Sequence, residues 1–138
     1  MGLDTSHDCW HGAYSAFSRW RNAVAIAAGY TVSRSTEGGW LHDDVDIDWD
    51  AFEQKNYHGE WDHPPGDDPL LYLIVHSDCD GVIHPKEGAP LATRLEQLLP
   101  KLDESQSGGH IWSMREVTQR FIDGLRKAAM AGEDVDFH

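Results

Sequence analysis

The feature that most constrains the fold is an apolar run over residues 70–75, which passes directly into the polar sequence His-Ser-Asp-Cys-Asp-Gly at 76–81. Six apolar residues bounded by Pro69 and a glycine-containing turn are typical of a strand buried on both faces. Side chains that follow such a strand lie at the rim of the sheet, where α/β proteins place their sites. The run therefore predicts a central strand over residues 70–76 with a polar site at its exit.

A second stretch carries similar chemical groups. Residues 6–12 read Ser-His-Asp-Cys-Trp-His-Gly, and they stand just before a strongly periodic helix. We expect the fold to bring residues 6–12 and 76–81 together around one polar pocket. The pocket would be lined by imidazole, carboxylate and thiol groups, namely His7, Asp8, Cys9, His11, His76, Asp78 and Asp80.

Apolar residues recur at spacings of three and four in three segments, and this periodicity predicts amphipathic helices. Ser113 and Glu116 form a capping-box pattern before the last of them, and Gly29 and Pro100 follow the first two. Residues 1–138 are expected to form a single α+β domain, a small sheet with the central strand 70–76 covered by three helices. The helices are expected at about 13–28, 89–99 and 114–131.

Residues 30–69 are expected to be a loop-rich insertion within this domain. Glycine and serine in 30–40 and proline and glycine in 57–69 predict irregular structure. Residues 42–50 alternate strictly between apolar and acidic side chains, which predicts a strand. A short helix is expected over 51–56.

The two ends of the chain favour extended structure. Residues 3–9 predict an edge strand or an extended arm, and residues 133–138 a last short strand or an ordered arm. A polar loop is expected over 103–109.

Charge limits the partners. The chain has 11 Lys and Arg against 24 Asp and Glu, a formal net charge of −13, which disfavours duplex nucleic acid bound through its phosphates. It leaves open an acidic decoy that blocks a basic host defence protein. The decoy face would be residues 43–50, where one side of the predicted strand carries carboxylates: Asp44, Asp46, Asp48 and Asp50.

Two cysteines are too few for a secreted disulfide scaffold, and no apolar run is long enough to span a membrane. We therefore expect a cytoplasmic protein with no membrane partner, and the oligomeric state stays open.

One interpretation of these polar groups is that they bind a divalent metal ion. On an extended arm His7, Cys9 and His11 would point the same way, and His76 with Cys79 would complete a tetrahedral set of nitrogen and sulfur ligands of the kind zinc prefers. The predicted metal ligands are His7, Cys9, His76 and Cys79.

Residues 75–83, Val-His-Ser-Asp-Cys-Asp-Gly-Val-Ile, resemble the first motif of the haloacid dehalogenase-like phosphatases, an apolar strand followed by Asp-x-Asp-Gly. The resemblance implies that Asp78 is a nucleophile toward a phosphoryl group and Asp80 a general acid, with magnesium between them. A metal-dependent phosphoesterase or hydrolase with these catalytic residues is therefore one alternative.

A binding pocket without turnover uses the same groups. Aromatic faces would stack on a ligand, and arginines would donate charge-assisted hydrogen bonds to a phosphate or carboxylate. The predicted ligand-binding residues are His7, Asp8, Trp10, His11, Tyr14, Arg19, His76 and Ser77.

Several blocks of the chain, residues 1–21, 76–81, 95–100, 121–129 and 137–138, resemble a group of small proteins carried by bacteriophages and bacteria. The resemblance implies a phage-type accessory protein, and small phage accessory proteins often sequester a host signal molecule or block a host defence protein. Our leading hypothesis is binding of a small polar or phosphorylated, nucleotide-like ligand; the hydrolase and the acidic decoy are the alternatives.

Overall fold

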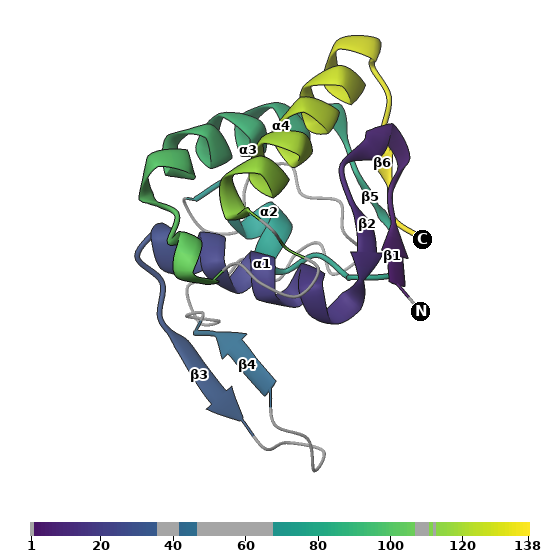
Figure 1. Cartoon of the computed structure of the whole chain (residues 1–138). Helices are drawn as coiled ribbons and strands as arrows, with labels where there is room; N and C mark the ends of the chain where they lie inside the picture. Colours follow the sequence, from purple (N-terminus) through teal and green to yellow (C-terminus); the bar gives the residue numbers. More distant parts are fainter. Residues whose placement is uncertain (1, 36–41, 47–67, 107–110, 112) are drawn as a thin grey trace.

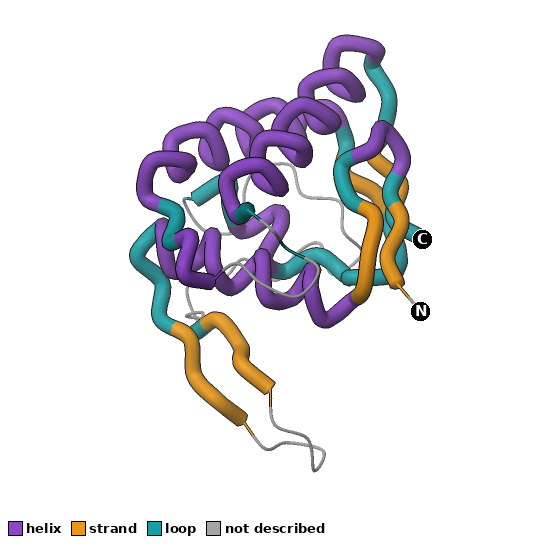
Figure 2. Tube along the Cα trace, in the orientation of Figure 1, coloured by secondary structure: helices purple, strands orange, loops and turns teal. Residues whose placement is uncertain are grey.

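The structure, a computed structural model of the chain, describes residues 2–35, 42–46, 68–106, 111 and 113–138 (Figures 1 and 2). Within them four α-helices and three small antiparallel sheets form one mixed α and β domain. The helices are α1 (Tyr14–Ala27), α2 (Leu71–Ile74), α3 (Pro85–Leu98) and α4 (Met114–Ala131), with 3-10 turns η1 (Ser6–Asp8), η4 (Leu99–Lys101) and η5 (Glu104–Gln106).

Each sheet in the described part has two strands. The strands are β1 (Gly2–Asp4), β2 (His11–Ala13), β3 (Val32–Ser35), β4 (His42–Val45), β5 (Val82–Ile83) and β6 (Val135–Asp136), paired in the order β1-β2, β3-β4 and β5-β6. A bridge between Thr5 and Phe137, with reciprocal backbone hydrogen bonds between Asp4 and His138, joins the first sheet to the last. The chain termini therefore lie side by side (Figure 1).

The core lies between the helices. α3 and α4 pack side by side, α1 crosses beneath them, and α2 fills the space between (Figure 1). Trp20 of α1 and Phe121 of α4 are both fully buried with ring centroids 4.7 Å apart. The Trp20 indole donates to Thr118 Oγ1 at 2.8 Å, so this buried polar group is satisfied within the core.

The three predicted helices are confirmed. Ser113 Oγ accepts from Glu116 N at 3.2 Å at the start of α4, as the capping pattern predicted. Gly132 ends α4 in the left-handed conformation with φ 68°, which glycine adopts without a steric cost.

The prediction of a central strand at 70–76 is wrong, because residues 71–74 form the short helix α2. Asp68 starts the helix: its carboxylate accepts from Leu70 N at 2.9 Å, and its carbonyl accepts from Leu71 N. Pro69 lies two residues before α2, where its missing N–H breaks no helical hydrogen bond. A short apolar run fits a buried strand and a buried helical turn equally well, and the Asp-Pro pair decides between them here.

The other end of α2 is capped by α1. Arg21 Nη1 donates to His76 O at 2.6 Å and to Leu73 O at 3.3 Å, so the last carbonyls of the turn have a cationic partner. Burial lowers the pKa of Arg21, and the nearby Asp78 carboxylate acts in the opposite direction. Arg21 therefore stabilises the C-terminal end of α2 against α1.

α3 begins at Pro85, four residues before the predicted start near residue 89. His84 is the N-cap, and its backbone N–H donates to Glu87 Oε1 at 3.0 Å. Pro90 consequently lies inside the helix rather than in its first turn.

Part of the predicted insertion is ordered as a hairpin. β3 forms in residues 32–35, where the sequence predicted a loop, and β4 confirms the start of the predicted strand at 42–50. The hairpin projects from the helices (Figure 1). The remaining predictions for this segment, including Asp48, Asp50, the helix at 51–56 and the loop at 57–67, lie outside the described residues.

Candidate functional site

Residues 6–9 fold into a tight turn on α4 rather than an extended arm, and His11 and Gly12 then belong to β2. His7 and Asp8 have positive φ angles, 59° and 56°, a conformation that costs non-glycine residues of the order of 1 kcal/mol or more. A Cβ on Gly124 of α4 would lie 2.4 Å from Cys9 Sγ and 2.8 Å from His7 O. The turn therefore needs glycine at this position of the helix.

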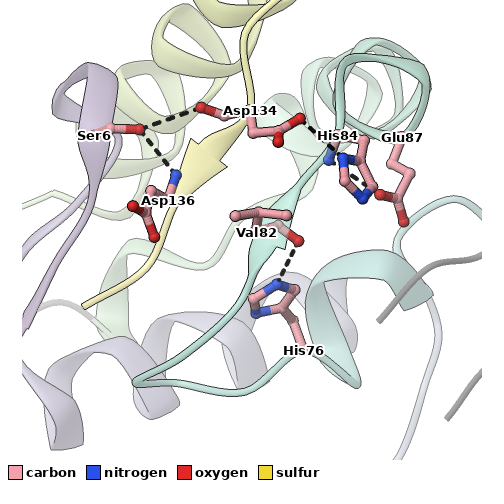
Figure 3. Close-up of polar contacts among 7 residues, drawn as sticks. All are labelled: Ser6, His76, Val82, His84, Glu87, Asp134 and Asp136. Carbon is pink, nitrogen blue, oxygen red and sulfur yellow. Dashed lines mark hydrogen bonds and ion pairs between the residues drawn. The ribbon is translucent and has the colours of Figure 1, made fainter. Parts of the chain in front are cut away.

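The C-terminal segment, residues 133–138, lies beside this turn. Ser6 Oγ accepts from Asp136 N at 2.9 Å (Figure 3), and His7 Nε2 lies 3.2 Å from Glu133 Oε1. His84 Nδ1 lies 2.9 Å from Asp134 Oδ1 on the other side of the segment.

The second polar stretch, 76–81, meets the same segment from the opposite side. His76 Nε2 lies 3.0 Å from Val82 O (Figure 3), and its ring centroid is 4.2 Å from that of Phe137. Phe137 N donates to Gly81 O at 3.0 Å. No hydrogen bond or ion pair links residues 6–12 with 76–81, both fully described, because the C-terminal segment stands between them. The expected common pocket is therefore not formed.

The predicted zinc ligands are not brought together either. Cys9 is buried under α4 whereas Cys79 is exposed, and burial raises the pKa of the Cys9 thiol to about 12. His11 is exposed beside Asp4, and His7 faces Glu133. Among the described residues, no three His, Cys, Asp or Glu side chains gather as metal ligands. The zinc or magnesium site stays a prediction that this geometry does not support.

Asp78 and Asp80 lie in the turn between α2 and β5. Asp80 Oδ1 accepts from Gly81 N at 2.8 Å, and Ser77 Oγ accepts from Cys79 N at 3.2 Å, contacts that shape the turn itself. The phosphatase motif that these residues resemble requires a strand before the first aspartate, and a helix stands there instead. A catalytic role for the two aspartates stays a prediction.

The acidic face of the hairpin is partly used within the hairpin. Arg34 Nε donates to Asp43 Oδ1 at 3.0 Å, and the hydroxyls of Thr31 and Ser33 donate to Asp46, lowering the pKa of that carboxyl. The acidic decoy remains a prediction.

A hollow of about 260 Å³ lies between β2 and α4, and it is the strongest candidate site. Its lining is Cys9, Trp10, His11, Gly12, Ala16, Glu116, Val117 and Arg120. Trp10 is only 6% exposed, and its Nε1 is the one buried side-chain nitrogen or oxygen without a partner in the described chain. A Cβ on Gly12 would lie 3.7 Å from this nitrogen. The indole nitrogen therefore lies beside Gly12, which lines the same hollow.

Arg120 and Glu116 line both this hollow and a second one. Arg120 Nε donates to Asp8 O at 2.9 Å, which fixes the guanidinium between the turn and α4. The second hollow, about 410 Å³, lies along the same helix face and is lined by His7, Asp8, Glu116, Gln119, Arg120, Asp123, Gly124 and Lys127.

Four predicted ligand-binding residues line these two hollows: His7, Asp8, Trp10 and His11. The other four, Tyr14, Arg19, His76 and Ser77, line neither. Sequence reasoning missed Glu116 and Arg120, although Glu116, Arg120, Asp123 and Lys127 recur at the spacings of one helix face. Charged residues at these spacings usually form ion pairs on a helix surface. Only their position opposite Trp10 identifies Glu116 and Arg120 as part of the candidate site.

No protein-family model matches this chain, and no curated protein or solved structure is detectably similar to it. A search of the described helices finds none that combines the length and the apolar character needed to cross a membrane. Functional inference therefore starts from the hollow beside Trp10, where a buried donor, a guanidinium and a carboxylate meet at one small cavity.

Proposed function

We propose that the protein binds a small polar ligand in the hollow beside Trp10 and holds it without changing it chemically. The observation that carries this proposal is the buried, unpartnered indole N–H of Trp10. Leaving a buried donor without an acceptor costs about 1–3 kcal/mol. A ligand that places an acceptor beside this nitrogen would recover the free energy on binding.

The surroundings suit binding of an acceptor group. Arg120 lies at the same hollow, and a guanidinium held by a backbone carbonyl keeps its remaining N–H groups available in a fixed orientation. His11 and Val117 provide a mixed polar and apolar wall, as small-molecule sites usually have.

Binding without turnover is favoured by the state of Cys9. Cys9 is the thiol of this hollow, and because its pKa is raised to about 12 it is protonated at neutral pH. A protonated thiol is a poor nucleophile. Retention of an unchanged ligand is the behaviour needed to sequester a small signal molecule, and we propose this role for the protein.

Isothermal titration calorimetry with nucleoside monophosphates and free amino acids tests the proposal. Trp10→Phe removes the donor, and we expect binding of any ligand found to weaken about tenfold or more. Trp20→Phe is the matched control, because the Trp20 indole already has Thr118 as its partner. The ligand recovered after incubation should be chemically unchanged. Equal affinities of the wild type and Trp10→Phe would contradict the proposal.

A further inference from the structure

We infer that the hollow beside Trp10 takes a small zwitterion of the free amino acid type, carrying one carboxylate and one ammonium group, rather than a phosphate ester. This inference rests on the proposed function and names its ligand class. Two donors, Trp10 and Arg120, and one acceptor, Glu116, determine it.

The donors select a carboxylate. The Trp10 indole offers a single N–H, and it is buried. Arg120 uses Nε for Asp8 O, so its two terminal nitrogens remain for a ligand. A planar carboxylate accepts two parallel hydrogen bonds from one guanidinium, and either of its oxygens can also accept from the indole.

The acceptor selects an ammonium group. Glu116 stands one turn before Arg120 on α4, a spacing at which Glu and Arg commonly form an ion pair. No such pair forms between them in the described structure, since Arg120 turns toward Asp8 O instead. The Glu116 carboxylate therefore borders the hollow with its charge uncompensated by that arginine, and a ligand ammonium group would compensate it.

The same charges oppose a phosphate. One guanidinium and one carboxylate line the hollow, Asp8, Asp123 and Lys127 border the adjoining hollow, and the chain as a whole carries a net charge of −13. A dianion would be attracted by Arg120 but repelled by these carboxylates, whereas a zwitterion matches both signs.

The size of the hollow agrees with this ligand class. At about 260 Å³ it holds roughly eight or nine waters of ~30 Å³ each. That space suits a single amino acid.

Calorimetry with defined probes tests the inference. The twenty common amino acids are titrated first, and the tightest is compared with its deaminated acid, its decarboxylated amine, inorganic phosphate and adenosine monophosphate. Glu116→Gln should weaken the amino acid about tenfold while the deaminated acid binds equally well or better. Asp123→Asn is the matched control on the same helix, and it should leave the amino acid affinity within about twofold.

The outcomes separate this inference from the proposed function. If phosphate or adenosine monophosphate binds more tightly than any amino acid, and Trp10→Phe abolishes that binding, the inference of a zwitterionic ligand is refuted. The proposed binding site is then retained. An amino acid affinity that is unchanged in Glu116→Gln would also refute the inference of a zwitterionic ligand. Failure of every probe to bind, or binding that is unchanged in Trp10→Phe, would overturn both the inference and the proposed function.

Discussion

Residues 6–9 and 76–79 carry almost the same letters, Ser-His-Asp-Cys and His-Ser-Asp-Cys, yet the fold treats them differently. Cys9 is 1% exposed and packs against Gly124 of α4. Cys79 is exposed in a turn closed by Ser77. The first stretch borders two hollows, whereas the second is a surface connection that supports β5. The two stretches therefore carry the same types of side chain but differ in reactivity, because one thiol is buried and the other is exposed.

The largest expected difference between the stretches is in thiol reactivity. Burial raises the pKa of Cys9 from 9.0 to about 12, which lowers its thiolate fraction at pH 8 about a thousandfold relative to an ordinary thiol. Cys9 is also sterically covered by α4. We expect iodoacetamide to alkylate Cys79 at least ~100-fold faster than Cys9 in the native protein, as measured by peptide mass spectrometry over time.

In urea this difference should disappear, because the unfolded chain exposes both thiols. Comparable rates for Cys9 and Cys79 in the folded protein would show that the first stretch is not buried under α4.

The next effect concerns the glycines against which the stretches pack. Gly124→Ala would place a Cβ 2.4 Å from Cys9 Sγ, and overpacking of this kind should lower the free energy of unfolding by about 3 kcal/mol. Gly81→Ala is the comparison, since its Cβ would lie 3.5 Å from the His76 ring. Its cost, about 1–2 kcal/mol, should come from the positive φ alone. Urea denaturation measures both.

Cys9→Ala in the Gly124→Ala background should recover part of the loss, because it removes the sulfur but leaves His7 O at 2.8 Å. If Gly124→Ala were no more destabilising than Gly81→Ala, the close packing of the first stretch on α4 would be refuted.

The smallest effect is a dependence of stability on pH. The folded pKa of Cys9, about 12, is above its unfolded value of 9.0, so the folded protein keeps a proton that the unfolded chain loses. The contribution is complete below pH 9 and is lost as the pH rises from 9 toward 12. We expect a fall of about 1 kcal/mol in unfolding free energy between pH 8 and pH 10.

Tyr30, whose pKa is raised from 10.0 to about 12 by burial and by Asp68, adds a loss that is small at pH 10 and grows above it. Most of the fall up to pH 10 therefore comes from Cys9. Cys9→Ala should remove most of this fall and Cys79→Ala should retain it. A fall of the same size in Cys9→Ala would assign it to another group.

The sequence predicted local structure well where one segment carries its own signal. The helix expected over 114–131 has those bounds, with its cap at Ser113, and the helix expected over 13–28 spans Tyr14–Ala27. Prediction failed at 70–76, because six apolar residues do not distinguish a strand from a helical turn. The Asp68-Pro69 helix start was the signal that was overlooked.

The candidate site was only half predictable. Trp10 and His11 were expected to bind a ligand because of their chemistry and their place before α1, and they do line the hollow. Glu116 and Arg120 were not expected, because on their own helix they resemble an ordinary surface pair.

The sequence by itself determined the three long helices and the polar, ligand-suited character of residues 6–12, because helical periodicity and side-chain chemistry are local properties. Only the tertiary structure decided which polar groups meet. Arg120 reaches Asp8 across 112 positions of the chain, and Trp10 is left without a hydrogen-bond partner beside the hollow that residues 9–12 share with α4. Such pairings depend on long-range packing, which places residues by their burial rather than by their order in the chain.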